Sequence, residues 1–169
     1  MSALTDRIIA GQERARGADL DYLRTVADTS LAAFAKFGLA GPFLEHRTHV
    51  APAPWHLARL AATRAQDCGT CVQTIVNAAR ADGVAADTLR AALADGDGLA
   101  PDEALAWRFG DAVARQADGR DALIAEVRAA FGEAGHAELA LAVATAQLFP
   151  ILKRGLGQDI ACSLIHVEV

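Results

Sequence analysis

Apolar residues recur along most of this chain at the three- and four-residue spacing of an amphipathic helix. Leu23, Ala27, Leu31 and Phe34 fall on one helical face, and Gly38 followed by glycine and proline at 41–42 ends that predicted helix. Alanine dominates the composition, aromatic residues are few and β-branched runs are short. The first forty residues therefore predict helical structure rather than strands.

Helix start and stop signals bound the helices that follow. Pro52 and Pro54 bracket a turn, and Pro54 suits the first position of a helix to about Gln66, because an N–H in the first turn has no partner within the helix. Gly83 suits the left-handed C-cap of the next helix, over 67–82. Four further helices are predicted from apolar spacing. The first contains Leu89 and Leu93, and the second follows Pro101 and contains Leu105, Phe109, Ala112 and Val113. The third contains Leu123, Ile124, Val127 and Phe131, and the fourth runs from His136 to about Leu156, separated from the third by Gly132 and Gly135. The sequence predicts an all-α fold of about seven helices.

No internal repeat, low-complexity linker or shift in composition divides the chain. We therefore expect residues 1–169 to form a single domain, with residues 1–40 as a helical N-terminal extension. A chain of 169 residues with 53% hydrophobic content is long enough to bury one core. Ser163 to Val169 is short and apolar and is predicted to be extended, so either the chain's own core or a neighbouring subunit must cover it.

Charge and hydropathy narrow the class of partner. A net charge of -5 without a cluster of Lys and Arg argues against binding to nucleic acid or to an anionic membrane surface. Met1 to Ala10 has no basic segment followed by an apolar core, so we expect a cytoplasmic protein. Leu139 to Leu152 is interrupted by Gln147 and Pro150 and is shorter than the roughly 20 residues of a membrane span. It predicts a buried core helix.

The cysteine pair Cys68-Gly69-Thr70-Cys71 carries the clearest chemical signal. Cysteines three apart on a helix share one face at about 5–6 Å between Cβ atoms, so a small adjustment gives disulfide geometry. In the first turn of a helix, unpaired backbone N–H groups and the positive end of the dipole favour the thiolate. Gly69 and Thr70 are small and are expected to leave the sulfurs accessible to a bulky partner. The motif predicts a thiol–disulfide redox site.

Two other interpretations of Cys68 and Cys71 stay open at this point. A closed structural zinc site needs four ligands, and without a second cysteine pair only His46, His49 and His56 could complete one. Alternatively, both cysteines pack as small hydrophobic residues. Neither is preferred, and we expect no bound metal and no cofactor. The third cysteine, Cys162, is expected to be a buried or interface thiol without a redox role, while His46 and His49 are expected to be solvated.

The segment around the cysteines resembles a known family. The run Trp55 to Cys71, WHLARLAATRAQDCGTC, followed by the helix that ends at Asp82-Gly83-Val84, is similar to the alkylhydroperoxidase D and carboxymuconolactone decarboxylase family. The resemblance continues more weakly over Leu89, Leu93 and the segment 139–157, so it covers the chain from about Ala40 onward. It does not assign the N-terminal forty residues.

The resemblance implies an all-α, alkylhydroperoxidase D-like helical domain that forms homo-oligomers (dimers, trimers or hexamers). In the cysteine-bearing branch it implies reduction of a peroxide through a disulfide. By position, Cys71 would attack the peroxide and Cys68 would resolve the product. The physical argument from the helix N-terminus instead favours the first cysteine, Cys68, as the thiolate. The implied partners are a hydroperoxide or small-molecule disulfide substrate and a dithiol protein or small thiol as reductant.

Three positions depart from the family's proton relay. Its glutamate twelve residues before the first cysteine is His56 in this chain, its histidine before the second cysteine is Thr70, and its later histidine is Ile75. His56 can still carry protons because its unperturbed pKa lies near neutrality, whereas Ile75 cannot. We therefore expect the catalytic residues Cys71, Cys68 and His56 in a thiol peroxidase or disulfide reductase. The alternative is a non-catalytic oligomeric scaffold or ligand-binding protein that has lost the relay.

Overall fold

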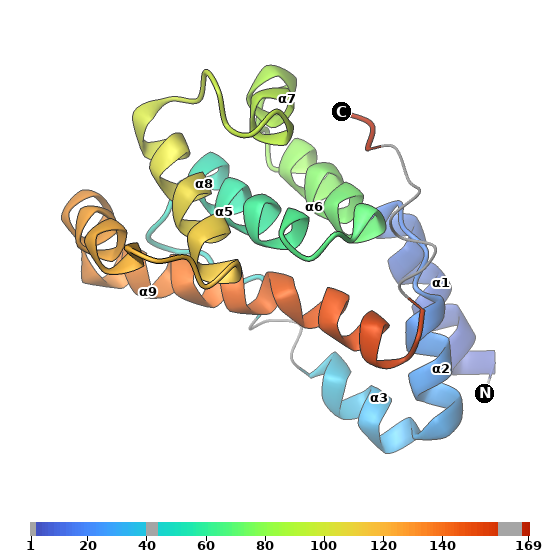
Figure 1. Cartoon of the computed structure of the whole chain (residues 1–169). Helices are drawn as coiled ribbons and strands as arrows, with labels where there is room; N and C mark the ends of the chain where they lie inside the picture. The colour runs from blue at the N-terminus through green and yellow to red at the C-terminus, as the bar shows by residue number, and fades with distance from the viewer. Residues whose placement is uncertain (1–2, 40–43, 159–166) are drawn as a thin grey trace.

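The computed structural model describes residues 3–39, 44–158 and 167–169, and this part of the chain is all-helical, without strands (Figure 1). It contains eight α-helices, so the prediction of an all-α fold of about seven helices is confirmed. The helices are α1 (Ala3–Arg16), α2 (Asp21–Thr29), α3 (Leu31–Gly38), α5 (Pro52–Arg64), α6 (Gly69–Ala81), α7 (Ala86–Leu93), α8 (Pro101–Ala114) and α9 (Arg120–Gly155).

Helix α5 is the centre of the fold and contacts α6, α7, α8 and α9 (Figure 1). From Pro54 to Thr63 every residue except Arg59 is buried. On the side that faces α8, a Cβ atom at Gly110 would overlap the backbone carbonyl of Ala58. Glycine at this position therefore allows α5 and α8 to pack backbone against backbone.

The start of α5 differs from the prediction. The helix begins at Pro52 rather than Pro54, and the two prolines lie within its first turn instead of bracketing a turn. Both fit there because the first four N–H groups of a helix have no intrahelical acceptor, so a missing N–H costs nothing.

The buried carboxylate of Glu138 in α9 holds the segment that leads into α5. Its oxygens accept hydrogen bonds from the backbone N–H groups of Thr48 (2.7 Å), His49 (2.9 Å) and Val50 (2.9 Å). Burial raises the pKa of Glu138, but these hydrogen bonds outweigh it and hold the pKa below its ordinary value. Glu138 thus fixes the position from which α5 begins.

The predicted helix through Leu23 and Phe34 is two helices, and this part of the prediction is wrong. The chain is extended at Ser30 (φ -154°, ψ 100°), which is the N-cap of α3 and accepts a hydrogen bond from the backbone N–H of Ala33. A serine hydroxyl competes with the helical hydrogen-bond pattern in this way. Because the break rotates the helical face, Leu31 is exposed rather than in line with Leu23.

Helix α9 bends at Gly132, whose left-handed φ of 70° interrupts the helical geometry. The predicted separation at this glycine is confirmed, whereas Gly135 lies within the helix. By length and composition α9 could span a membrane. In the fold it packs against α5 and α8 and contributes Leu139 and Val143 to the core, as the predicted core helix should.

The N-terminal helices and the C-terminal residues pack in different places. Ile9 and Leu23 of α1 and α2 form a second hydrophobic cluster with Phe149 of α9. At the other end of the chain, Val167 and Val169 pack against the main core beside α6. The chain's own core thus covers the described end of the apolar tail; residues 163–166 and Cys162 lie outside the described residues.

Several large apolar side chains remain exposed, on α1, α3 and the end of α9: Leu4, Ile8, Leu31, Leu148, Ile151 and Leu156, with Leu39 just after α3. Self-association stays a prediction.

Candidate functional site

The cysteine pair lies at the start of α6 and is joined as a disulfide. Asp67 has a left-handed φ of 53°, which turns the chain out of the preceding segment, and Cys68 is the N-cap of α6. Cys71 lies in the first turn, and the two Cα atoms are 5.3 Å apart. The predicted placement at a helix N-terminus is confirmed, although α6 begins at Gly69 rather than at Asp67.

Both cysteines are buried, with Cys68 4% and Cys71 8% exposed. They form a small cluster with Phe149 of α9. The expectation that Gly69 and Thr70 leave the sulfurs open to a bulky partner is therefore wrong for the described part of the chain. Small residues beside the cysteines do not expose them when another helix packs across the site.

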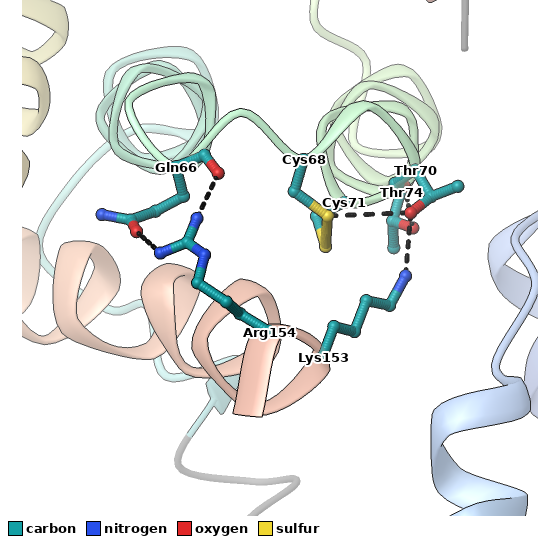
Figure 2. Close-up of a disulfide and its surroundings, with 7 residues drawn as sticks. All are labelled: Gln66, Cys68, Thr70, Cys71, Thr74, Lys153 and Arg154. Atoms are coloured by element: carbon teal, nitrogen blue, oxygen red, sulfur yellow. Dashed lines mark hydrogen bonds between the residues drawn. A yellow bond between two sulfur atoms is a disulfide. The ribbon is translucent and has the colours of Figure 1, made fainter. Parts of the chain in front are cut away.

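A buried lysine from α9 reaches the cysteine motif. Lys153 Nζ donates a hydrogen bond to Thr70 Oγ1 (2.8 Å), and the same hydroxyl lies 3.7 Å from Cys68 Sγ (Figure 2). The ammonium also lies 5.1 Å from the centre of the Tyr22 ring. A positive charge and a hydroxyl thus approach the sulfurs on the side covered by α9, and both favour a thiolate once the disulfide is reduced.

The neighbouring Arg154 fastens α9 to the connection between α5 and α6. Its guanidinium donates hydrogen bonds to the side-chain oxygen (3.2 Å) and the backbone oxygen (2.8 Å) of Gln66 (Figure 2). Gln66 lies just before the cysteine motif, so these bonds help to fix the position of α9 relative to the disulfide.

A small cavity of about 50 Å³ borders this site. Cys71, Lys153, Tyr22, Arg59 and Ile75 are among the residues that line it, whereas Cys68 is not. Since a cavity needs about 10–15 Å³ to hold one water molecule, this space fits a few water molecules or one small peroxide. Of the two cysteines, Cys71 is therefore the one that borders this space.

His56 is buried on a second and larger cavity of about 630 Å³. Burial lowers its pKa to about 4, against the opposing effect of its 2.9 Å hydrogen bond to Asp82, so the imidazole is neutral near pH 7. Hydrogen bonding to His56 in turn lowers the pKa of Asp82. Because Asp82 is an ionised acceptor, the neutral ring donates from Nε2 and its Nδ1 is left as an acceptor.

The structure places His56 and Cys71 on adjacent cavities rather than in one. Ile75 and Thr74 line both spaces, and Ile75 is buried and carries no proton. A direct relay from His56 to the sulfurs stays a prediction. Lys153 and Arg59 were missed, although each is a basic residue within an apolar helical pattern, and that pattern could have singled them out.

Within the described part of the chain, no group of zinc ligands comes together around the cysteines. His46 and His49 are exposed. Among the described residues, the group of possible metal ligands that comes together is Glu13, Asp19 and Asp21, and it includes neither cysteine. Two of these carboxylates already accept hydrogen bonds from the guanidinium of Arg24: Glu13 (2.5 and 2.8 Å) and Asp21 (2.8 Å).

Comparisons of the chain with models of known families, with curated proteins and with solved structures find no match. The fold and the site define an all-α protein with a C-x-x-C disulfide at a helix N-terminus, beside a buried lysine.

Proposed function

We propose that this protein is an alkylhydroperoxidase-like thiol peroxidase that reduces small hydroperoxides through Cys68 and Cys71. The observation that carries the proposal is that Cys71 shares a cavity of about 50 Å³ with the buried ammonium of Lys153. The cavity admits a small oxidant, and the cation favours the thiolate that must attack it. The resemblance of the segment from Trp55 to Cys71 to the alkylhydroperoxidase D family supports the same chemistry.

The reaction begins with the reduced pair. The Cys71 thiolate attacks the distal oxygen of the hydroperoxide, the O–O bond breaks, and the departing alkoxide takes a proton to leave as an alcohol. Cys71 is then a sulfenic acid. Cys68 attacks that sulfur, a disulfide forms and water leaves. The two thiols have given two electrons to the peroxide, and a dithiol protein or two molecules of a small thiol return them.

The departing alkoxide needs a proton donor, and two residues compete for this role. Lys153 borders the cavity of Cys71, and its hydrogen bond to Thr70 connects it to Cys68 as well. His56 was the candidate from the sequence, but it borders the neighbouring cavity. We therefore assign the proton to Lys153, with the Thr70 hydroxyl as its link to the second thiol.

The test uses protein in which Cys162 is replaced by serine, so that only the pair reports. After reduction, the Cys68→Ser protein should react with hydrogen peroxide and stop at a sulfenic acid that a trapping reagent labels. Cys71→Ser should give no such adduct. Swapped labelling would exchange the two roles. If neither variant differs from the parent with any hydroperoxide, the peroxidase proposal fails and the non-catalytic alternative stands.

The proton donor is tested with a matched pair of variants. Lys153→Met should slow oxidation about 10²-fold, the low end of general acid–base contributions, whereas His56→Ala should change the rate much less. Circular dichroism should show that both variants keep their helices. The opposite ranking would return the relay to His56.

A further inference from the structure

The cavity beside His56 is large enough to hold a ligand. Its volume of about 630 Å³ lies in the range of small-molecule sites, roughly 300–1,000 Å³. Trp55, Ile75 and Ala78 supply apolar wall, while polar groups come from α1, α5 and α6. Such a combination of apolar surface with a few polar groups is typical of a binding site for an organic molecule.

The charges around this cavity do not balance. Arg16, Arg47 and Arg59 face two carboxylates, and each carboxylate already has a basic partner. Glu45 pairs with Arg16 at 3.7 Å, and Asp82 pairs with Arg47 at 3.2 Å. Within the described part of the chain, Arg59 has no carboxylate within 4.0 Å. With His56 neutral, one positive charge remains.

Three buried polar atoms of residues that line this cavity have no hydrogen-bond partner in the described protein. They are Trp55 Nε1, His56 Nδ1 and Arg59 Nε, all on α5. The guanidinium carbon of Arg59 lies over the Trp55 ring, 4.2 Å from its centre. Buried polar groups are nearly always paired in native proteins, so three unpaired atoms at one cavity require an explanation.

We propose that this cavity binds a small organic carboxylate that also carries a hydroxyl group. The carboxylate would accept hydrogen bonds from Arg59 and from Trp55 Nε1, and the hydroxyl would donate to His56 Nδ1. Burial lowers the pKa of Arg59 to about 10, so the guanidinium stays charged at neutral pH. A single excess positive charge matches one carboxylate better than a phosphate, which carries about two negative charges at neutral pH.

The binding test must be kept apart from the redox chemistry, because Arg16, Arg59, Thr74 and Ile75 also border the cavity of Cys71. Binding is therefore measured on the oxidised protein, in which the disulfide carries no charge. Isothermal titration calorimetry compares 3-hydroxyhexanoate with its uncharged amide and with hexanoate. The hydroxy acid should bind about tenfold or more tightly than the amide, because charge-assisted hydrogen bonds to Arg59 are lost with the charge.

Hexanoate tests the second contact. It should bind more weakly than 3-hydroxyhexanoate by a few-fold to tenfold, because His56 Nδ1 is left without a donor. Equal affinity of the hydroxy acid and the amide would overturn the carboxylate site. Equal affinity of the hydroxy acid and hexanoate would overturn the assignment of the hydroxyl to His56.

A matched pair of arginine variants completes the test. Arg59→Met removes the charge but keeps an apolar side chain of similar length, and should abolish the preference for the acid over the amide. Arg90→Met is the control, since Arg90 is exposed on α7 and pairs with Asp87. An unchanged preference in Arg59→Met overturns the proposal. Because no peroxide is present in this experiment, its outcome does not bear on the peroxidase proposal.

Discussion

The two sides of α5 differ sharply, although their residues are neighbours in the sequence. On one side Ala58 meets the backbone of α8 at Gly110, and no room is left for a single methyl group. On the other side the next residue, Arg59, borders two cavities. One helix thus serves both as the centre of the core and as the wall of the candidate sites.

This difference shows where a buried helix can carry chemistry. Leu57 and Leu60 are fully buried, and so is Ala58, so their side of α5 stabilises the fold by close packing. Trp55, His56 and Arg59 keep polar atoms unpaired, which costs stability and is retained only where something else is gained. Residues on both sides of α5 are buried, so burial does not distinguish the sides. They differ in that the side with Trp55, His56 and Arg59 has buried polar atoms without hydrogen-bond partners in the described part of the chain.

The largest expected effect comes from closing the packed side. Gly110→Ala should destabilise the protein by about 3 kcal/mol or more, because its Cβ would meet backbone rather than a side chain that can move. Urea unfolding followed by circular dichroism measures this change. Gly11→Ala in α1 is the control, since nothing lies within 4 Å of a Cβ there. The control should be neutral or more stable by about 0.5–1 kcal/mol. Equal effects in both variants would contradict close packing at Gly110.

The next effect concerns the open side and depends on pH. The pKa of His56 falls from an ordinary 6.5 to about 4 on folding, so below pH 6.5 the unfolded chain binds this proton first. Stability is therefore lost as the pH falls from about 6.5 to 4, and the loss from pH 7 to pH 5 should be about 2 kcal/mol. His56→Gln should remove this part of the pH dependence. Parallel pH profiles of unfolding free energy would show that His56 titrates normally. Asp82 does not enter this window, because its pKa is lowered from 3.8.

The smallest effect is expected at the boundary between the two cavities. Ile75→Val should cost about 0.5–1 kcal/mol, the lower part of the usual range for this change, because the lost methyl group borders existing space and leaves no new sealed void. Urea unfolding at pH 7 measures it. A cost well above 1.5 kcal/mol would mean that Ile75 is packed as tightly as the side of α5 that faces α8.

The helices were predictable because their apolar spacing and their proline and glycine signals are local. The positions at which helices end or bend were less predictable. Ser30 ends one helix and caps another through its own side chain, yet it lies in an unbroken helical pattern. Gly132 and Gly135 look alike in the sequence, but only Gly132 takes a left-handed φ, whereas Gly135 packs within α9 against Val50 and Phe131. Contacts between helices decide such cases.

The candidate site also contains residues that local spacing predicts and residues that depend on contacts between distant helices. Cys68 and Cys71 were predictable because their spacing alone brings the sulfurs together. Lys153 lies more than eighty residues further along the chain, and its hydrogen bond to Thr70 exists only because the end of α9 lies beside the start of α6 (Figure 2). Phe149 of the same helix packs against the sulfurs that the sequence alone suggested were accessible. The role of His56 stays a prediction, and spacing in the sequence indicates neither its partner Asp82 nor its own cavity.

The disulfide closes a very short loop, since its cysteines are three positions apart in the sequence. A crosslink stabilises a fold mainly by restricting the unfolded chain, and for so short a loop the chain-entropy model gives only about 2 kcal/mol. In a thermodynamic cycle, folding shifts the redox equilibrium of the pair by the same free energy as oxidation shifts the folding equilibrium. The two equilibria are therefore weakly linked through chain entropy. We therefore expect the helices around the pair to stay folded when the disulfide is reduced.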